Sequence, residues 1–155
     1  MVRAAHKHRV KRVVITSSVA AIMAELPGSN KGEKGFTEDD WSDISTCGPY
    51  EKSKTLAEKA AWDFMYGLPE EERFELVTIN PGLILGPSLI ASDFTSGQII
   101  KKLMSGKYPG MPKIMLPVVD VRDAAFAHLQ AIKVDRARNK RFALVAESMW
   151  FKDLA

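Results

Sequence analysis

The sequence is short of cysteine, of long apolar runs and of excess charge. Cys47 is the only cysteine among 155 residues, so no internal disulfide can form, and a reducing compartment, the cytoplasm, fits best. No apolar run approaches the roughly 20 residues of a membrane-spanning helix, and the N-terminus has the wrong order of charge and hydrophobicity for a secretory signal. We therefore expect a soluble cytoplasmic protein that crosses no membrane.

The formal net charge of +3 is modest, and much of the local excess lies in one N-terminal run, residues 6–12. Such a run could meet phosphates, but a solvated helix end that leads into a strand is the simpler interpretation. His6 and His8 within it have no cysteine or carboxylate partner at the spacing of a metal site. The sequence thus predicts neither a nucleic-acid partner nor a bound metal.

The apolar pattern predicts strands and helices in alternation. Strands or short extended pieces are expected at 12–16, 74–80, 83–87, 117–121 and 141–146. Helices are expected at 1–9, 50–66, 96–104 and 122–133, with another beginning at 151–155. The polar stretch 25–48 between them is long for a compact domain, which indicates a loop that serves a site or is loosely ordered. This order predicts an α/β fold with a parallel sheet and flanking helices.

Pro49 and the Gly67-Leu68-Pro69 run delimit the expected helix 50–66, because proline suits a first helical position and glycine a helix end. Apolar residues recur along it at steps of three and four. The residues predicted to form its buried face are Leu56, Ala57, Ala60, Ala61 and Phe64. Those predicted to face water are Glu51, Lys52, Glu58, Lys59 and Asp63.

Tyr50 and Lys54 are four residues apart, so both side chains fall on one face of this helix. A phenol is a poor acid at neutral pH, and a nearby ammonium stabilises its phenolate. Ser18 follows the first strand, where an open α/β sheet places ligand-facing residues. Taken alone, the pair also fits a half-buried aromatic at a helix start followed by a solvated lysine.

Four segments in order resemble the extended short-chain dehydrogenases/reductases: VVITSSVAA at 13–21, YEKSKTLAE at 50–58, NPGLILGP at 80–87, and VDVRDAA at 119–125 with His128 just beyond. Within that family the chain is most similar to the dihydroflavonol, cinnamoyl-CoA and fungal methylglyoxal (aldehyde/ketone) reductases. AEKAAW at 57–62 and FEL at 74–76 look most like the last group. His128 has a family counterpart, but a packing or helix-end role is the simpler expectation.

The resemblance implies an NADP-dependent oxidoreductase, with NAD as the alternative, that reduces a small aldehyde or ketone to an alcohol. Tyr50 would donate a proton to the carbonyl oxygen, Lys54 would stabilise the phenolate and bind the nicotinamide ribose, and Ser18 would orient the carbonyl. The residues that it implies for cofactor binding are Thr16, Ser17, Tyr50, Lys54, Pro81, Gly82, Leu83, Ile84 and Ser96. Met23 stands where plant flavonoid reductases carry a polar contact, which argues against a flavonoid substrate.

The family opens with a Gly-x-x-Gly-x-x-Gly turn that binds the pyrophosphate, and these 155 residues contain none. We therefore expect residues 1–155 to form a single partial Rossmann-like domain, without the Gly-rich unit and without the C-terminal substrate lobe. Two alternatives remain open: a non-catalytic interaction module, or a related chemistry such as that of sugar-nucleotide epimerases/dehydratases or hydroxysteroid dehydrogenases. The oligomeric state is left open.

Overall fold

A parallel three-stranded sheet forms the centre of the fold. The computed structural model describes residues 1–24, 35–89, 95–106, 110 and 112–154. The sheet has the order β1-β2-β5, and its strands are β1 (Arg12–Thr16), β2 (Glu75–Pro81) and β5 (Lys140–Leu144). In the parallel register, Arg12 pairs with Glu75 and Val77 with Lys140. The three predicted strands are confirmed, with shifts of one or two residues at some ends.

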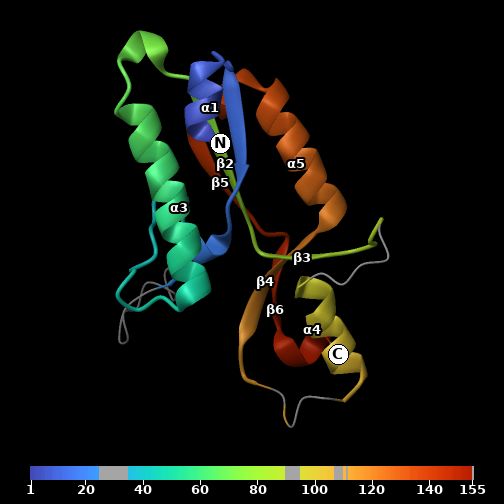
Figure 1. Cartoon of the computed structure of the whole chain (residues 1–155). Helices are drawn as coiled ribbons and strands as arrows, with labels where there is room; N and C mark the ends of the chain where they lie inside the picture. The colour runs from blue at the N-terminus through green and yellow to red at the C-terminus, as the bar shows by residue number, and fades with distance from the viewer. Residues whose placement is uncertain (25–34, 90–94, 107–109, 111, 155) are drawn as a thin grey trace.

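Helices cover both faces of this sheet (Figure 1). The long helix α3 (Pro49–Tyr66) lies on one side, and α5 (Val121–Lys133) lies on the other. The short helix α1 (Val2–Lys7) adds Val2 and Ala5 to the apolar cluster on the α3 side. The prediction of an α/β fold with a Rossmann-type parallel sheet and flanking helices is therefore confirmed.

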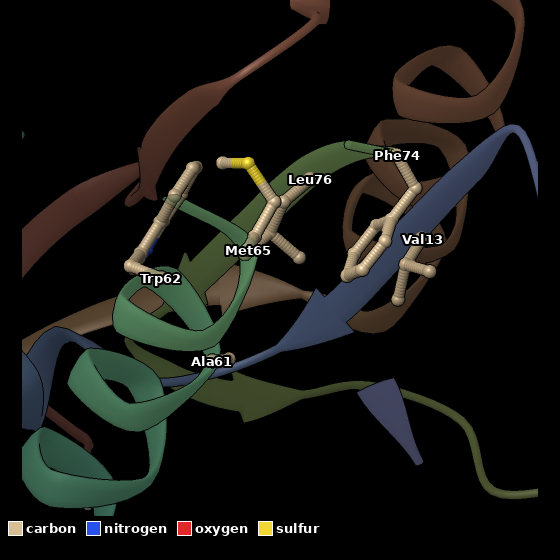
Figure 2. Close-up of a cluster of buried hydrophobic side chains, with 6 residues drawn as sticks. All are labelled: Val13, Ala61, Trp62, Met65, Phe74 and Leu76. Atoms are coloured by element: carbon tan, nitrogen blue, oxygen red, sulfur yellow. The ribbon is translucent and has the colours of Figure 1, made fainter. Parts of the chain in front are cut away.

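The apolar core has one part on each face of the sheet, because successive side chains of a strand point to opposite sides. On the α3 side, the buried cluster consists of Val13, Ala61, Trp62, Met65, Phe74 and Leu76. Figure 2 shows these side chains gathered between α3 and the first two strands. On the α5 side, the cluster consists of Val77, Ile79, Ala131 and Ala137. β2 thus contributes to both halves of the core.

A second, smaller sheet follows the first at its carboxyl end (Figure 1). In it, β3 (Leu83–Leu85) pairs in parallel with β4 (Met115–Asp120), and β4 pairs antiparallel with β6 (Glu147–Trp150). The helix α4 (Thr95–Met104) was predicted within one residue, whereas β6 was not predicted. The single-turn 3₁₀ helices are η1 (Val19–Ala21), η2 (Glu70–Glu72), η3 (Asp135–Ala137) and η4 (Phe151–Leu154), the last where a helix was expected to begin.

The buried face of α3 differs from the predicted one. Ala61 is buried and Phe64 half-buried as expected, but Leu56, Ala57 and Ala60 are exposed. The buried positions are Thr55, Glu58, Ala61, Trp62 and Met65. The prediction that Glu58 faces water is wrong: the residue is 1% exposed. The helix carries apolar residues on two faces, and polar partners on the sheet decide which of them is buried.

We expect Leu76→Ala to lower the free energy of unfolding by about 2 to 5 kcal/mol, because a fully buried side chain would leave a cavity between the sheet and α3. Urea unfolding of the chain measures this. Leu89→Ala is the control, since Leu89 is fully exposed and should change stability by less than about 0.5 kcal/mol. Equal effects of the two substitutions would contradict this description of the core.

Candidate active site

One open pocket of about 860 Å³ lies at the carboxyl ends of β1 and β2 and extends to α3, β3 and β4. This is the edge at which open parallel α/β sheets bind ligands. Every site residue predicted from the sequence lines it: Thr16, Ser17, Ser18, Tyr50, Lys54, Pro81, Gly82, Leu83, Ile84 and Ser96. The structure thus brings together residues that are up to 80 positions apart in the sequence.

The first turns of α3 present the tyrosine and the lysine. Gly48 is the N-cap of the helix and Pro49 its first residue, so the helix begins one residue before Tyr50. The ammonium nitrogen of Lys54 lies 5.9 Å from the centroid of the Tyr50 ring. Tyr50 is 57% exposed, so its phenol is accessible from the pocket, beside a positive charge.

The two serines after β1 use their hydroxyls differently. Ser18 Oγ accepts a hydrogen bond from the Ala20 backbone N–H at 3.1 Å and caps the short turn η1. A hydroxyl that accepts still has its own hydrogen to donate, and Ser18 has no acceptor for it among the described residues. Ser17 instead donates its hydroxyl to the carboxylate of Glu58. Of the two, Ser18 has the hydroxyl hydrogen available to a ligand.

Thr16 contacts α5 through His128. His128 Nδ1 lies 2.7 Å from the Ala124 carbonyl oxygen, which can only accept, so this nitrogen carries the hydrogen. Nε2 lies 2.7 Å from the Thr16 hydroxyl oxygen, a hydrogen-bond distance. His128 thus links the end of β1 to α5. A contact between Thr16 and a cofactor remains a prediction.

The buried carboxylate of Glu58 accepts hydrogen bonds from β2, from β5, from the turn after β1 and from α3 itself. The donors to Oε1 are Arg141 Nε at 2.7 Å, Thr78 Oγ1 at 3.0 Å and the Trp62 indole at 3.4 Å. The donors to Oε2 are the Ser17 hydroxyl and the Asn80 amide, the latter at 2.7 Å. Thr78 and Asn80 are two residues apart on β2, so both face α3, and Arg141 is the register partner of Thr78 on β5.

Two opposing effects act on the pKa of the Glu58 carboxyl. Burial alone would raise this pKa. The hydrogen bonds from Arg141 and Ser17 and the charge of Arg141 together outweigh burial and hold the pKa below its usual value. Glu58 is therefore a buried carboxylate that stays charged.

Arg141 extends the same network to the segment before α3. Its Nη1 donates to the backbone carbonyls of Glu38 at 2.5 Å and Asp40 at 2.6 Å. Its guanidinium carbon lies 3.7 Å from the centroid of the Trp41 ring, a cation–π contact. One side chain therefore holds part of this predicted loop against the sheet.

Sequence reasoning missed Glu58, Asn80 as a hydrogen-bonding residue, and Arg141. One signal was available: Glu58 follows Lys54 by four residues, on the helical face that carries Tyr50. No comparable signal marks Arg141, because its partner lies 83 residues away in the sequence.

Residues 81–84 form part of the pocket wall, and close packing restricts the backbone there. A Cβ at Gly82 would lie 2.4 Å from the Pro117 carbonyl oxygen, so no larger residue fits there without a shift. β3 forms an edge of its sheet, and its outer backbone edge faces no other strand among the described residues. A contact between this wall and a nicotinamide ring remains a prediction.

The 119–125 segment acts as a helix start. Asp120 Oδ1 accepts from the Arg122 backbone N–H at 2.7 Å and so caps α5. The Arg122 guanidinium binds the same carboxylate through two nitrogens, at 2.9 and 2.7 Å. These bonds lower the pKa of Asp120 to about 2. The fourth family-like motif thus has a structural explanation.

Three further features lie outside this set of site residues. His6 pairs with Glu72 at 2.9 Å, and Cys47 is a half-buried thiol on the pocket wall. Over the described residues, no group of three or more His, Cys, Asp or Glu side chains could hold a metal ion. Within the same part of the chain, none of the helices combines the length and apolar content needed to span a membrane.

The fold and the pocket define an α/β protein of the Rossmann type. No protein-family model matches the sequence. The chain is similar to the ketoreductase azaE of Aspergillus niger, with 38% identity over 92% of this chain and 44% of that protein. It is 34% identical to the NADPH-dependent methylglyoxal reductase GRE2 of Saccharomyces cerevisiae, over 80% of this chain and 40% of that one. With cinnamoyl-CoA reductase 1 of Arabidopsis thaliana it shares 34% identity, over 96% and 42%.

Among solved structures, Gre2 of Candida albicans in complex with NADPH superimposes with a TM-score of 0.78 at 34% identity, over 95% of this chain and 47% of that chain. The chain therefore belongs to the extended short-chain dehydrogenase/reductase family, as predicted. It spans less than half the length of the curated relatives that it matches here.

We expect Glu58→Gln to lower the free energy of unfolding at pH 7 by about 3 to 5 kcal/mol, because it leaves Arg141 buried without a counter-charge. The folded-state pKa of Glu58 is depressed, so its contribution is fully present above the ordinary value of 4.5 and is lost as pH falls through the folded pKa. The difference in free energy of unfolding between wild type and variant should therefore become smaller as pH falls from 5 to 3. Urea titrations at several pH values measure it, and a constant gap would contradict this assignment.

Proposed function

We propose that this chain provides the catalytic part of an NADPH-dependent carbonyl reductase, which reduces a small aldehyde or ketone to an alcohol. The observation that carries the proposal is the grouping of Ser18, Tyr50 and Lys54 in one pocket, which residues 81–84 also line. The relatives reported above support the same chemistry, since they are named as reductases and one of them as NADPH-dependent.

Each residue has a distinct task in this reaction. Ser18 donates its free hydroxyl hydrogen to the carbonyl oxygen of the substrate and so orients it. Tyr50 delivers a proton to that oxygen, and the Lys54 ammonium stabilises the phenolate left behind. NADPH, when bound, supplies the hydride that the carbonyl carbon receives. One hydride and one proton together convert the C=O group to CH–OH, and Tyr50 regains its proton from solvent.

The pocket suits the nicotinamide end of the cofactor. The 81–84 wall would hold the nicotinamide ring, Lys54 the adjoining ribose, and Thr16, Ser17 and Ser96 would add contacts nearby. The side-chain amide oxygen of Asn80, which directly precedes this wall, is buried and has no hydrogen-bond donor within the described part of the chain. We propose that these residues contact the nicotinamide and its ribose, and we assign no other part of the cofactor to them.

The substrate side of the pocket favours a small carbonyl compound. Met23, Ala24, Thr46 and Cys47 line it among the described residues. The relatives reported above carry no epimerase or dehydratase activity in their names, which favours carbonyl reduction.

We expect Tyr50→Phe to lower kcat for NADPH-dependent reduction of methylglyoxal by roughly 10²- to 10⁴-fold, the usual contribution of a general acid. Loss of NADPH absorbance measures the rate. Tyr66→Phe is the matched control, because Tyr66 is a similarly exposed tyrosine on the last turn of the same helix, away from the pocket. Equal kcat values for Tyr50→Phe and wild type would refute the assignment.

NADPH binding separates this proposal from the non-catalytic module. Nicotinamide fluorescence should change when NADPH is added to the purified chain. No change, together with the circular dichroism spectrum of a folded protein, would favour the interaction module instead.

A further inference from the structure

The two oxygens of the Glu58 carboxylate face different parts of the molecule. Oε1 binds Thr78, Trp62 and Arg141, none of which lines the pocket. Oε2 binds Ser17, which lines the pocket, and Asn80, which directly precedes Pro81 in the pocket wall. One oxygen therefore anchors α3 to the sheet, and the other contacts the structures that border the site.

Asn80 connects Oε2 of Glu58 to Ser18. Its amide nitrogen has two hydrogens. It donates one to Glu58 Oε2 at 2.7 Å and the other to the Ser18 backbone carbonyl at 3.1 Å. Ser17 and Ser18 are thus both tied to Glu58, Ser17 directly through its hydroxyl and Ser18 through Asn80.

The same helix carries Tyr50, Lys54 and Glu58 at successive steps of four residues, so about 12 Å of rigid helix separates the first from the last. Oε2 then fixes the Ser17–Ser18 turn relative to that helix. A carboxylate can only accept hydrogen bonds, and here the four donors from the strands and the turn after β1 leave it little freedom to rotate.

We propose that Glu58 is a positioning residue: its Oε2 sets the place of Ser18 relative to Tyr50 and Lys54, while Oε1 holds the helix to the sheet. Among the described residues, Ser18 shares no direct hydrogen bond with Tyr50 or Lys54, and the Glu58 carboxylate connects the serine turn to their helix. The positioning of the turn follows from geometry alone. Its consequence for catalysis rests on the proposed function.

The test removes one donor from each oxygen in the 155-residue chain, because Glu58→Gln would disturb both oxygens and also unbalance Arg141. Ser17→Ala removes a donor to Oε2, and Thr78→Val removes a donor to Oε1. Both hydroxyls are buried and both donate to the same carboxylate, so the variants are closely matched. Each should lower the free energy of unfolding to a similar extent.

The local readout is hydrogen exchange, measured by NMR, at the Ala21 and Ile22 amides, whose bonds close the turn after Ser18. Ser17→Ala should speed this exchange about tenfold, the effect of one lost hydrogen bond to a charged group. Thr78→Val should leave it unchanged. In the reductase assay, Ser17→Ala should lower kcat about tenfold with little change in KM, and Thr78→Val should lower neither.

The two readouts separate the two proposals. Unchanged exchange in Ser17→Ala, or equal acceleration in Thr78→Val, overturns the positioning role whatever the turnover. Selective acceleration with no turnover by the wild-type chain supports the positioning role and counts against the reductase proposal. Selective acceleration with a selective loss of kcat supports both.

Discussion

Glu58 and Arg141 form an ion pair whose side chains are 0% and 9% exposed, so both charges have left water. Removing such ions from water costs several kcal/mol each, and their attraction offsets this only when the remaining hydrogen-bonding groups are satisfied. Here Ser17, Thr78 and Asn80 donate hydrogen bonds to the oxygens of the carboxylate. The first sheet, helix α3 and the Ser17–Ser18 turn are consequently arranged around one charge.

The arrangement of the first sheet and α3 determines where the pocket residues lie. Parallel strands end at a common edge, which brings Ser18 and Pro81 to the same side of the sheet. Helix α3 begins at that edge because Gly48 and Pro49 start it there, and it carries Tyr50 and Lys54 within its first two turns. The arginine that neutralises the buried carboxylate also binds the backbone of Glu38 and Asp40. The same arginine therefore balances the buried charge and holds the segment before α3 against the sheet.

The sequence was informative wherever local rules decide the outcome. The β-branched run at 12–16 and the proline at the start of α3 predicted their elements, and family-like motifs identified the residues that line the pocket. The sequence was uninformative where a contact with a residue far along the chain decides whether a side chain is buried. Glu58 has the charge of a surface residue, and only Arg141, far along the chain, makes its burial tolerable. Leu56 is as apolar as a core residue, yet it is 45% exposed.

The register of the first sheet also bears on how the chain folds. β1 and β2 pair residues 63 positions apart, and β2 and β5 are similarly distant in sequence. Pairings of this kind close large loops before they gain any contact energy, which makes folding slow. The carboxylate of Glu58 adds cooperativity, because its donors come from β2, from β5, from the turn after β1 and from α3 itself. The absence of any of these segments takes donors away from a buried charge, so assembly of this half of the molecule is cooperative.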